Sequence, residues 1–245
     1  MAETNLWQTR IHGDLNDYTL IIPSVAVGNV GQLACDLLIS TLKMKKIESV
    51  YSPALIPTLG YDPYNLHSGS LTGSCELYQS VEKKLLIMQL RAPLVHKYAE
   101  PFLNEVVDKF KLKNIKEIIV LTSSFAHEKK HVLTSPFRYV CNQLWPCKNK
   151  VESLEWVEHE PKESVKIYGG GCASLLYSIA EQKAVPCFLL YKFSSEGDNI
   201  PDAYEMVHYL NKIVPFLNDE NLYSQLVQPV SWNLLFGRPP PIDIY

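Results

Sequence analysis

The sequence feature that most constrains the fold is an apolar segment interrupted by two glycines near the N-terminus, at residues 19–38. Residues 19–22 are a short apolar run typical of a buried strand, and the chain then reaches Gly28 and Gly31. From residue 30 apolar residues recur at the spacing of an amphipathic helix: Val30, Leu33, Ala34, Leu37 and Leu38. A strand, a glycine turn and a helix packed back on the strand form the opening unit of an α/β fold.

This turn is close to the dinucleotide-binding fingerprint G-x-G-x-x-G but does not complete it. Ala26 stands where the first glycine of that pattern belongs, ahead of Gly28 and Gly31. The fingerprint also requires an acidic residue about 20 positions further on, at the end of the second strand, to hold a ribose. The strand predicted at residues 47–51 has Glu48 at its start instead. We therefore interpret the glycines as a structural turn beside a closely packed helix, and we predict no cofactor.

The rest of the chain predicts a single domain over residues 1–245, a three-layer α/β/α fold with a mixed, largely parallel central sheet. Further strands are expected at residues 47–51, 75–79, 84–90, 115–122, 165–168 and 185–193, the second and third of them forming a hairpin. Further helices are expected from about residue 97 to 110, at 172–181 and from about 200 to 214. Residues 53–73 are interpreted as a long ordered loop, and residues 123–164 as an insertion.

Two more glycine turns precede predicted helices. Gly169, Gly170 and Gly171 separate a predicted strand from a predicted helix, which repeats the pattern of the N-terminal unit. Gly197 lies before the last predicted helix, where Asp198 or Asn199 can accept hydrogen bonds from the free amides of the first turn. We interpret all of these glycines as structural turns.

Composition and charge exclude several classes of partner. The formal net charge is −3, hydrophobic residues make up 47% of the chain, and no run of Lys and Arg marks a nucleic-acid-binding face. No apolar stretch reaches the ~20 residues that a membrane span requires, and the first residues lack a secretory signal pattern. We therefore expect a cytosolic or nuclear protein that binds neither nucleic acid nor membrane. Its six cysteines, none in C-x-x-C spacing, are expected to be reduced and mostly buried.

Residues 127–131 read H-E-K-K-H, which formally matches the H-E-x-x-H motif of zinc proteases. In those enzymes a buried helix brings both imidazoles to one metal while the glutamate activates water. Here the motif is flanked by charged residues without helical periodicity, and a third ligand can only be guessed, as Glu152 or Glu155. We interpret the segment as a solvated loop and predict no metal site.

Cys172 directly follows the glycine triplet at the start of a predicted helix. A thiol in that position can have a lowered pKa and act as a nucleophile. No histidine lies close to it in the sequence, and the sequence alone leaves open whether the fold brings one beside it. We interpret Cys172 as a small apolar residue in a tight turn, and we predict no catalytic residue.

The C-terminus, from about residue 231 to 245, is predicted to be an extended tail with an unusual concentration of apolar residues. Its first part, Trp232 to Phe236, is expected to pack on the core. Three consecutive prolines then stiffen the segment before the chain ends in Ile242, Ile244 and Tyr245. A terminal aromatic residue beside a free carboxylate suits a pocket with a cation at its mouth, so we predict that these three residues bind a partner.

Several stretches together resemble the proteasome assembly chaperone 2 family. They are residues 23–34 (PSVAVGNVGQLA), 134–139 (TSPFRY), the glycine triplet, 193–203 (FSSEGDNIPDA) and 231–237 (SWNLLFG). The resemblance implies a non-enzymatic α/β/α chaperone of cytoplasm and nucleus. It implies a heterodimer with proteasome assembly chaperone 1 that promotes formation of the 20S proteasome α-ring and prevents off-pathway association of α-subunits.

The same resemblance bears on the tail. Proteins of this kind can end in a hydrophobic-Tyr-any motif that inserts between α-subunits and offers its carboxylate to a pocket lysine. This chain departs from the motif because Tyr245 is the last residue rather than the second to last. The resemblance also implies that H-E-K-K-H and Cys172 are incidental.

An alternative of another class is an α/β enzyme of nucleoside phosphorylase or hydrolase type. It would bind phosphate or a nucleotide at the turn of residues 28–31 or at that of residues 169–171. Such a site requires polar side chains that converge on these turns.

Overall fold

A computed structural model describes residues 6–7, 11, 13–131, 133–160 and 165–234. Its centre is a seven-stranded sheet in the order β2-β5-β6-β1-β7-β9-β8. The strands are β1 (Thr19–Pro23), β2 (Lys45–Ser49), β5 (Cys75–Ser80), β6 (Leu85–Leu90), β7 (Glu117–Phe125), β8 (Phe137–Cys141) and β9 (Cys187–Ser194). The four central strands β6, β1, β7 and β9 run parallel, whereas the pairs β2–β5, β5–β6 and β8–β9 are antiparallel. The predicted mixed, largely parallel sheet is confirmed.

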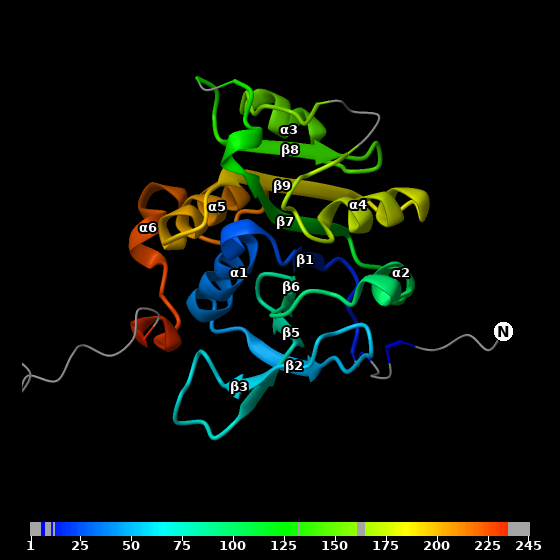
Figure 1. Ribbon diagram of the computed structural model, residues 1–245, viewed down its shortest axis with the longest axis vertical. Coiled ribbons are helices and arrows are strands. Elements are labelled where there is room, and N and C mark those ends of the chain that lie inside the picture. Colours follow the sequence, from blue (N-terminus) through cyan, green and yellow to red (C-terminus); the bar gives the residue numbers. More distant parts are fainter. Residues whose placement is uncertain (1–5, 8–10, 12, 132, 161–164, 235–245) are drawn as a thin grey trace, which may run out of the picture.

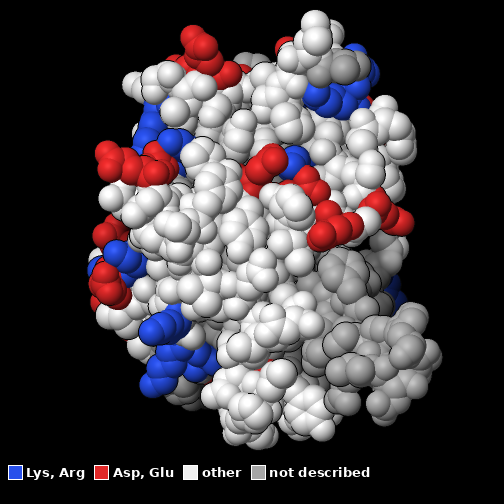
Figure 2. Space-filling view, turned by 90° about the vertical axis from the view of Figure 1, so that its left-hand side faces the viewer, with Lys and Arg blue, Asp and Glu red and all other residues white. Residues whose placement is uncertain are grey.

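Helices cover both faces of the sheet (Figure 1). One face carries α1 (Val30–Thr41) and α5 (Ile200–Ile213), and the other carries α2 (His96–Leu112) and α4 (Ala173–Gln182). Strand β1 contributes side chains to the core on both faces of the sheet. Leu20 and Ile22 belong to the cluster with α2 and α4, whereas Ile21 belongs to the cluster with α1 and α5. The predicted α/β/α layering is confirmed. On the α5 side, charged residues form separate groups on the surface (Figure 2).

Shorter elements complete the described part of the chain. They are the helices α3 (Lys148–Ser153) and α6 (Leu222–Gln225) and the 3-10 helices η1 (Val27–Asn29), η2 (Ala126–Glu128), η3 (Asp219–Asn221) and η4 (Val230–Leu234). A two-stranded sheet is formed by β3 (Leu59–Tyr61) and β4 (Leu71–Gly73).

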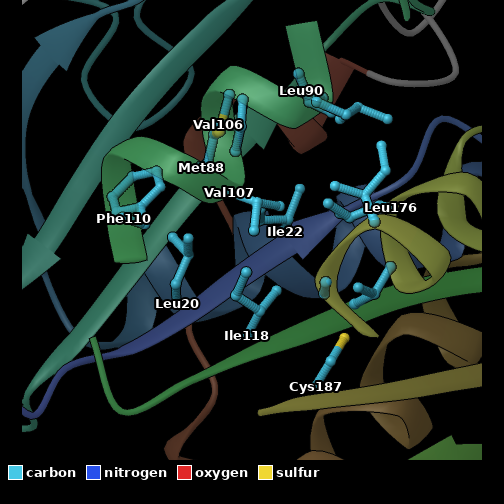
Figure 3. Close-up of a cluster of buried hydrophobic side chains, with 14 of the residues drawn as sticks. Leu20, Ile22, Met88, Leu90, Val106, Val107, Phe110, Ile118, Leu176 and Cys187 are labelled. Carbon is cyan, nitrogen blue, oxygen red and sulfur yellow. The ribbon is translucent and has the colours of Figure 1, made fainter. Parts of the chain in front are cut away.

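The core on the α2 side shows how the N-terminus is held. Side chains of α2, among them Phe110, pack on strand residues such as Leu20 and Ile118 (Figure 3). Trp7 is fully buried in the same cluster, with its ring centroid 5.8 Å from that of Phe110. The backbone amide of Trp7 donates to the carboxylate of Glu105 on α2 over 2.8 Å. The N-terminal segment is thereby anchored to helix α2.

The interpretation of residues 53–73 as a loop is wrong in part, because they contain the hairpin β3–β4. Its strands are short and rich in glycine, and Gly60 and Gly73 weaken the local strand pattern. Hydrogen bonds between the segments that flank the hairpin stabilise it. Ser74 Oγ accepts from the amide of Thr58 over 2.8 Å and donates to the carbonyl of Ile56 over 2.6 Å.

Two further predictions are corrected. Residues 165–168 were expected to be a strand, but they form no strand because β9 pairs with β7 from Ile118 to Phe125 and occupies that edge. Residues 123–164 are more than an insertion, since they supply β8, the last strand of the central sheet. Strand β8 is short and antiparallel, and its second residue is the charged Arg138, which hides its strand character in the sequence.

Candidate functional site

The two glycine turns lie together at the carboxyl ends of β1 and β7, the edge where open α/β sheets commonly bind ligands. The amide of Val27 donates to the carbonyl of Gly169 over 3.0 Å. The amide of Cys172 donates to Ser24 Oγ, just after β1, over 2.8 Å. The fold therefore joins two turns that are far apart in the sequence, at the place where an enzyme of this class would need its site.

Three consecutive hydroxyl groups at the end of β7 hold the two turns. Thr122 Oγ1 donates to the carbonyl of Gly170 and Ser124 Oγ to that of Tyr168, each over 2.9 Å. Ser123 Oγ donates to the carbonyl of Val27. All three side chains are buried. These three hydroxyl groups are bonded to the chain's own carbonyls, so they give the enzyme alternative no support.

The space around these glycines is also filled by the chain itself. Gly28 has a φ of 65°, and a Cβ there would lie 2.6 Å from Asn199 Oδ1. At Gly171, with a φ of 61°, a Cβ would collide with the carbonyl of Val25. These glycines therefore permit close approach of segments of the chain. Gly197 lies in the bend between β9 and α5.

Cys172 lies at the start of α4 but lacks the lowered pKa of an activated thiol. Burial raises the pKa of Cys172 above its ordinary value, although the hydrogen bond from Ser24 acts in the opposite direction. Ser24 Oγ donates to its sulfur over 3.5 Å. A nucleophilic cysteine needs a lowered pKa and positively charged surroundings. Among the other cysteines, Cys35, Cys75 and Cys187 are buried.

The H-E-K-K-H segment does not form the helix that a zinc site of this type requires. Ala126–Glu128 is a short 3-10 helix, and the residues after it are not helical. The imidazole of His127 is exposed and stacks on Phe125, with the ring centroids 5.2 Å apart. Among the residues that the structure describes, no three His, Cys, Asp or Glu side chains gather as a metal would need, Glu152 and Glu155 included.

The most distinctive surface feature is the apolar face of the β3–β4 hairpin. Leu59 and Tyr61 point to the same side of β3, and Leu71 is the cross-strand partner of Tyr61. Their exposed fractions are 76%, 75% and 53%. We call these three residues the hairpin face. This face is not among the features predicted from the sequence, where the alternation Leu-Gly-Tyr between turn-forming residues is its signal.

The C-terminal segment packs beside this hairpin before the tail begins. Trp232 is buried in the core cluster with α1 and α5, which confirms its predicted packing on the core. The backbone of residues 230–234 forms η4 rather than extended chain. The predicted partner-binding residues of the tail lie outside the described residues, so their role stays a prediction: Ile242, Ile244 and Tyr245.

Comparison with known proteins identifies the family of the chain. The profile of the PAC2 family matches residues 20–219. The chain belongs to the PAC2 family. The PAC2-family chain is 39% identical to proteasome assembly chaperone 2 of Mus musculus and 36% identical to that of Homo sapiens; each match covers 95% of this chain and 96% of the relative.

A solved structure supports the fold of this PAC2-family chain. PbaA of Pyrococcus furiosus, described as an archaeal homolog of proteasome-assembly chaperone, superposes with a TM-score of 0.68. The match covers 88% of this chain and 89% of PbaA at 19% sequence identity, so it speaks for the fold alone. Within the described residues, no helix has the length and apolar character to cross a membrane.

Proposed function

We propose that this PAC2-family chain is a non-enzymatic chaperone for assembly of the 20S proteasome. It acts as a heterodimer with proteasome assembly chaperone 1, in the cytoplasm and the nucleus. The observation that carries the proposal is the similarity to proteins named proteasome assembly chaperone 2, which extends over 95% of the chain at 36–39% identity.

The mechanism we propose is binding rather than catalysis. The heterodimer holds α-subunits in register while the α-ring forms and keeps them from off-pathway association. Two features of the molecule support this: the carboxyl edge of the sheet is filled by the chain's own atoms, and apolar side chains are exposed on the hairpin face. The tail adds a contact to the α-subunits through Ile242, Ile244 and Tyr245, because apolar side chains beside a free carboxylate suit a pocket lined by a cation.

A pull-down from cytosolic extract tests the proposal. The intact chain is compared with a version that ends at Pro241 and so lacks the last apolar residues. We expect both versions to recover the second chaperone, proteasome assembly chaperone 1. The shortened version should recover fewer proteasome α-subunits. Recovery of neither a partner chaperone nor α-subunits by the intact chain would overturn the proposed function.

A further inference from the structure

A small cavity lies beside strand β8, between helix α5 and the segment that follows α3, at the edge of the sheet (Figure 1). Its volume is about 150 Å³. Phe137 on β8 and Leu190 on β9 form its buried lining, whereas Trp156 and Tyr209 are half-buried. Pockets that hold drug-sized ligands measure about 300–1,000 Å³. The cavity therefore has room for a single side chain rather than for a nucleotide.

The walls of the cavity are aromatic. The ring of Tyr209 is nearly parallel to that of Phe137, at an angle of 16° and with the centroids 3.8 Å apart. The ring centroid of Trp156 lies 4.8 Å from that of Tyr209, with the two planes at 38°. The rings of the first pair are in contact and leave no space between them, so a ligand must lie against Trp156 and Tyr209. Aromatic faces attract cations, and the face of tryptophan does so most strongly.

Hydrogen bonds hold the two walls in place. The amide of Tyr139 on β8 donates to the carbonyl of Val157 over 3.2 Å, which fixes the segment that carries Trp156. On the other wall, the hydroxyl oxygens of Ser135 and Tyr209 lie 3.1 Å apart, within hydrogen-bonding distance. Walls that are fixed before binding lose less conformational entropy when a ligand enters.

The margin of the cavity is acidic. Glu155, an exposed residue, lines it. On α5, Glu205 lies one helical turn before Tyr209 and therefore on the same side of the helix. The segment of residues 151–160 has no Lys or Arg and contains four glutamates: Glu152, Glu155, Glu158 and Glu160. A positively charged group is the ligand that such surroundings favour.

The ammonium of Lys192 lies near the cavity but does not reverse this charge. Its Nζ is 5.5 Å from the ring centroid of Phe137. The same Nζ donates to Asp202 and, over 2.7 Å, to Glu205. Two carboxylates against one ammonium leave this group with one net negative charge.

Three further basic side chains of the neighbouring elements are bound elsewhere. The guanidinium of Arg138 lies 5.4 Å from the ring centroid of Phe193, beside the core on the opposite face of the sheet. Lys212 is paired with Asp219, and Lys150 Nζ donates to the carbonyl at the end of α5 over 3.5 Å. The cavity is therefore left with aromatic walls and an acidic margin.

From these walls and this margin we infer that the cavity binds the side chain of an arginine from a partner protein. The planar guanidinium stacks on aromatic faces and is more weakly hydrated than an ammonium. A carboxylate such as that of Glu155 can pair with its charge. A free amino acid fits less well, because its own carboxylate would lie among the glutamates. The inference goes beyond the proposed function and does not depend on which protein supplies the arginine.

Titration with small arginine derivatives tests the chemistry of the cavity. N-acetyl-arginine methylamide is added to the full chain at constant ionic strength, and saturation-transfer NMR observes the ligand. The control is N-acetyl-citrulline methylamide, which has a similar shape without the charge. We expect the citrulline compound to bind about fivefold more weakly than the arginine compound. Equal binding of the two compounds, or no saturable binding of the arginine compound, would overturn the inference.

Two further ligands identify the source of the cation. Free arginine adds an α-carboxylate, and N-acetyl-lysine methylamide replaces the guanidinium by an ammonium. Both should bind more weakly than N-acetyl-arginine methylamide. Tighter binding of free arginine would overturn the assignment to a protein side chain, and tighter binding of the lysine compound would overturn the assignment to arginine.

Substitutions test whether the ligand binds in this cavity. Trp156→Leu should abolish binding, and Glu155→Gln should weaken it about threefold, as expected for the loss of an exposed charge pair. Glu100→Gln, at an exposed position of α2 on the opposite face of the sheet, is the matched control and should bind as the intact chain does. Because Glu155 is exposed, its variant keeps the fold even if Trp156→Leu does not. Unchanged binding by Glu155→Gln, or by folded Trp156→Leu, would place the ligand elsewhere and overturn the inference.

Discussion

At Gly31 the backbone of helix α1 lies closer to the sheet than any side chain permits. A Cβ at this position would lie 2.5 Å from the carbonyl oxygen of Leu121 on β7, and that oxygen belongs to the backbone and cannot turn aside. The two glycines that resemble a cofactor fingerprint are thus explained by packing of the chain. At the scale of single residues, the requirement for glycine here is steric.

This contact predicts the effect of a single methyl group. Gly31→Ala should lower the free energy of unfolding by about 1–3 kcal/mol, because overpacking forces the helix away from the sheet. Gly60→Ala is the matched control, since its Cβ would lie 3.7 Å from its nearest neighbour, in ordinary contact with Thr72. Urea denaturation followed by circular dichroism measures both. Equal midpoints for the two variants would show that α1 does not pack as described.

The thiol of Cys172 gives a second residue-scale prediction. Because burial raises its pKa, the thiolate fraction at pH 7 is below the few per cent of a free cysteine with a pKa of about 8.5. In the folded chain, iodoacetamide should therefore modify Cys172 more slowly than it modifies glutathione. Mass spectrometry of tryptic peptides at timed intervals measures the rate, and the urea-unfolded chain is the control. Modification faster than that of glutathione would contradict the interpretation of Cys172 as a structural residue.

At the scale of elements, periodic apolar patterns predicted what lies in the core. Helices α1 and α5 and strand β7 carry long apolar repeats, and each is found close to its predicted position. The hairpin β3–β4 and strand β8 were missed because contacts from distant segments stabilise them. For β8, the amide of Asn142 donates to the carbonyl of Cys187, a residue far away in the sequence.

The candidate binding surfaces also differ in how far the sequence alone predicts them. The apolar character of the tail was visible in the sequence, because it needs only composition and position. The hairpin face was not, because it depends on the cross-strand register of Tyr61 with Leu71 and on the anchoring of Thr72 to Glu76. The side chain of Leu59 is apolar whether it is buried or exposed, and only the fold decides that it faces solvent.

Glu76 provides the prediction that belongs to the hairpin as an element. Burial alone would raise the pKa of Glu76, but hydrogen bonds from Thr72, Tyr78 and Lys46 outweigh it and lower the pKa below its ordinary value. The unfolded chain therefore takes up the proton at higher pH than the folded chain does. The carboxylate contributes stability above the ordinary pKa of about 4.3, and this contribution is lost as the pH falls through the lower folded pKa.

Glu76→Gln should therefore be less stable than the intact chain at pH 7, by about 1–3 kcal/mol, because the buried donors lose a charged acceptor. The difference should shrink as the pH is lowered from 5 toward 3. Urea denaturation at several pH values measures it, and hydrogen exchange should show faster exchange in residues 59–73 of the variant. A stability difference independent of pH would contradict the role given to the carboxylate.

At the scale of the whole molecule, the place where an α/β enzyme holds its ligand is used for packing. Thr122, Ser123 and Ser124 are bonded to carbonyls of the two glycine turns, and the side chain of Asn199 fills the space beside Gly28. Function in this fold is accordingly expected at the outer surface, where the hairpin face and the root of the tail lie together.

This arrangement predicts how the whole molecule responds to ligands. A small molecule present at 100 times its dissociation constant stabilises a protein by about 2.7 kcal/mol, which for a chain of this size raises the melting temperature by about 5–10 °C. Millimolar phosphate, adenosine, ATP and GTP should each leave the melting temperature of the chain unchanged, because the hydroxyl groups of Thr122, Ser123 and Ser124 at the glycine turns are bonded to the chain's own carbonyls. Purified proteasome assembly chaperone 1 should raise it, and the rise should grow with the concentration of that partner, since binding to the folded state alone stabilises by mass action. Differential scanning fluorimetry measures both arms on the same sample. A concentration-dependent shift with phosphate or a nucleotide, and none with the second chaperone, would reverse the assignment and return the glycine turns to the role of a ligand site.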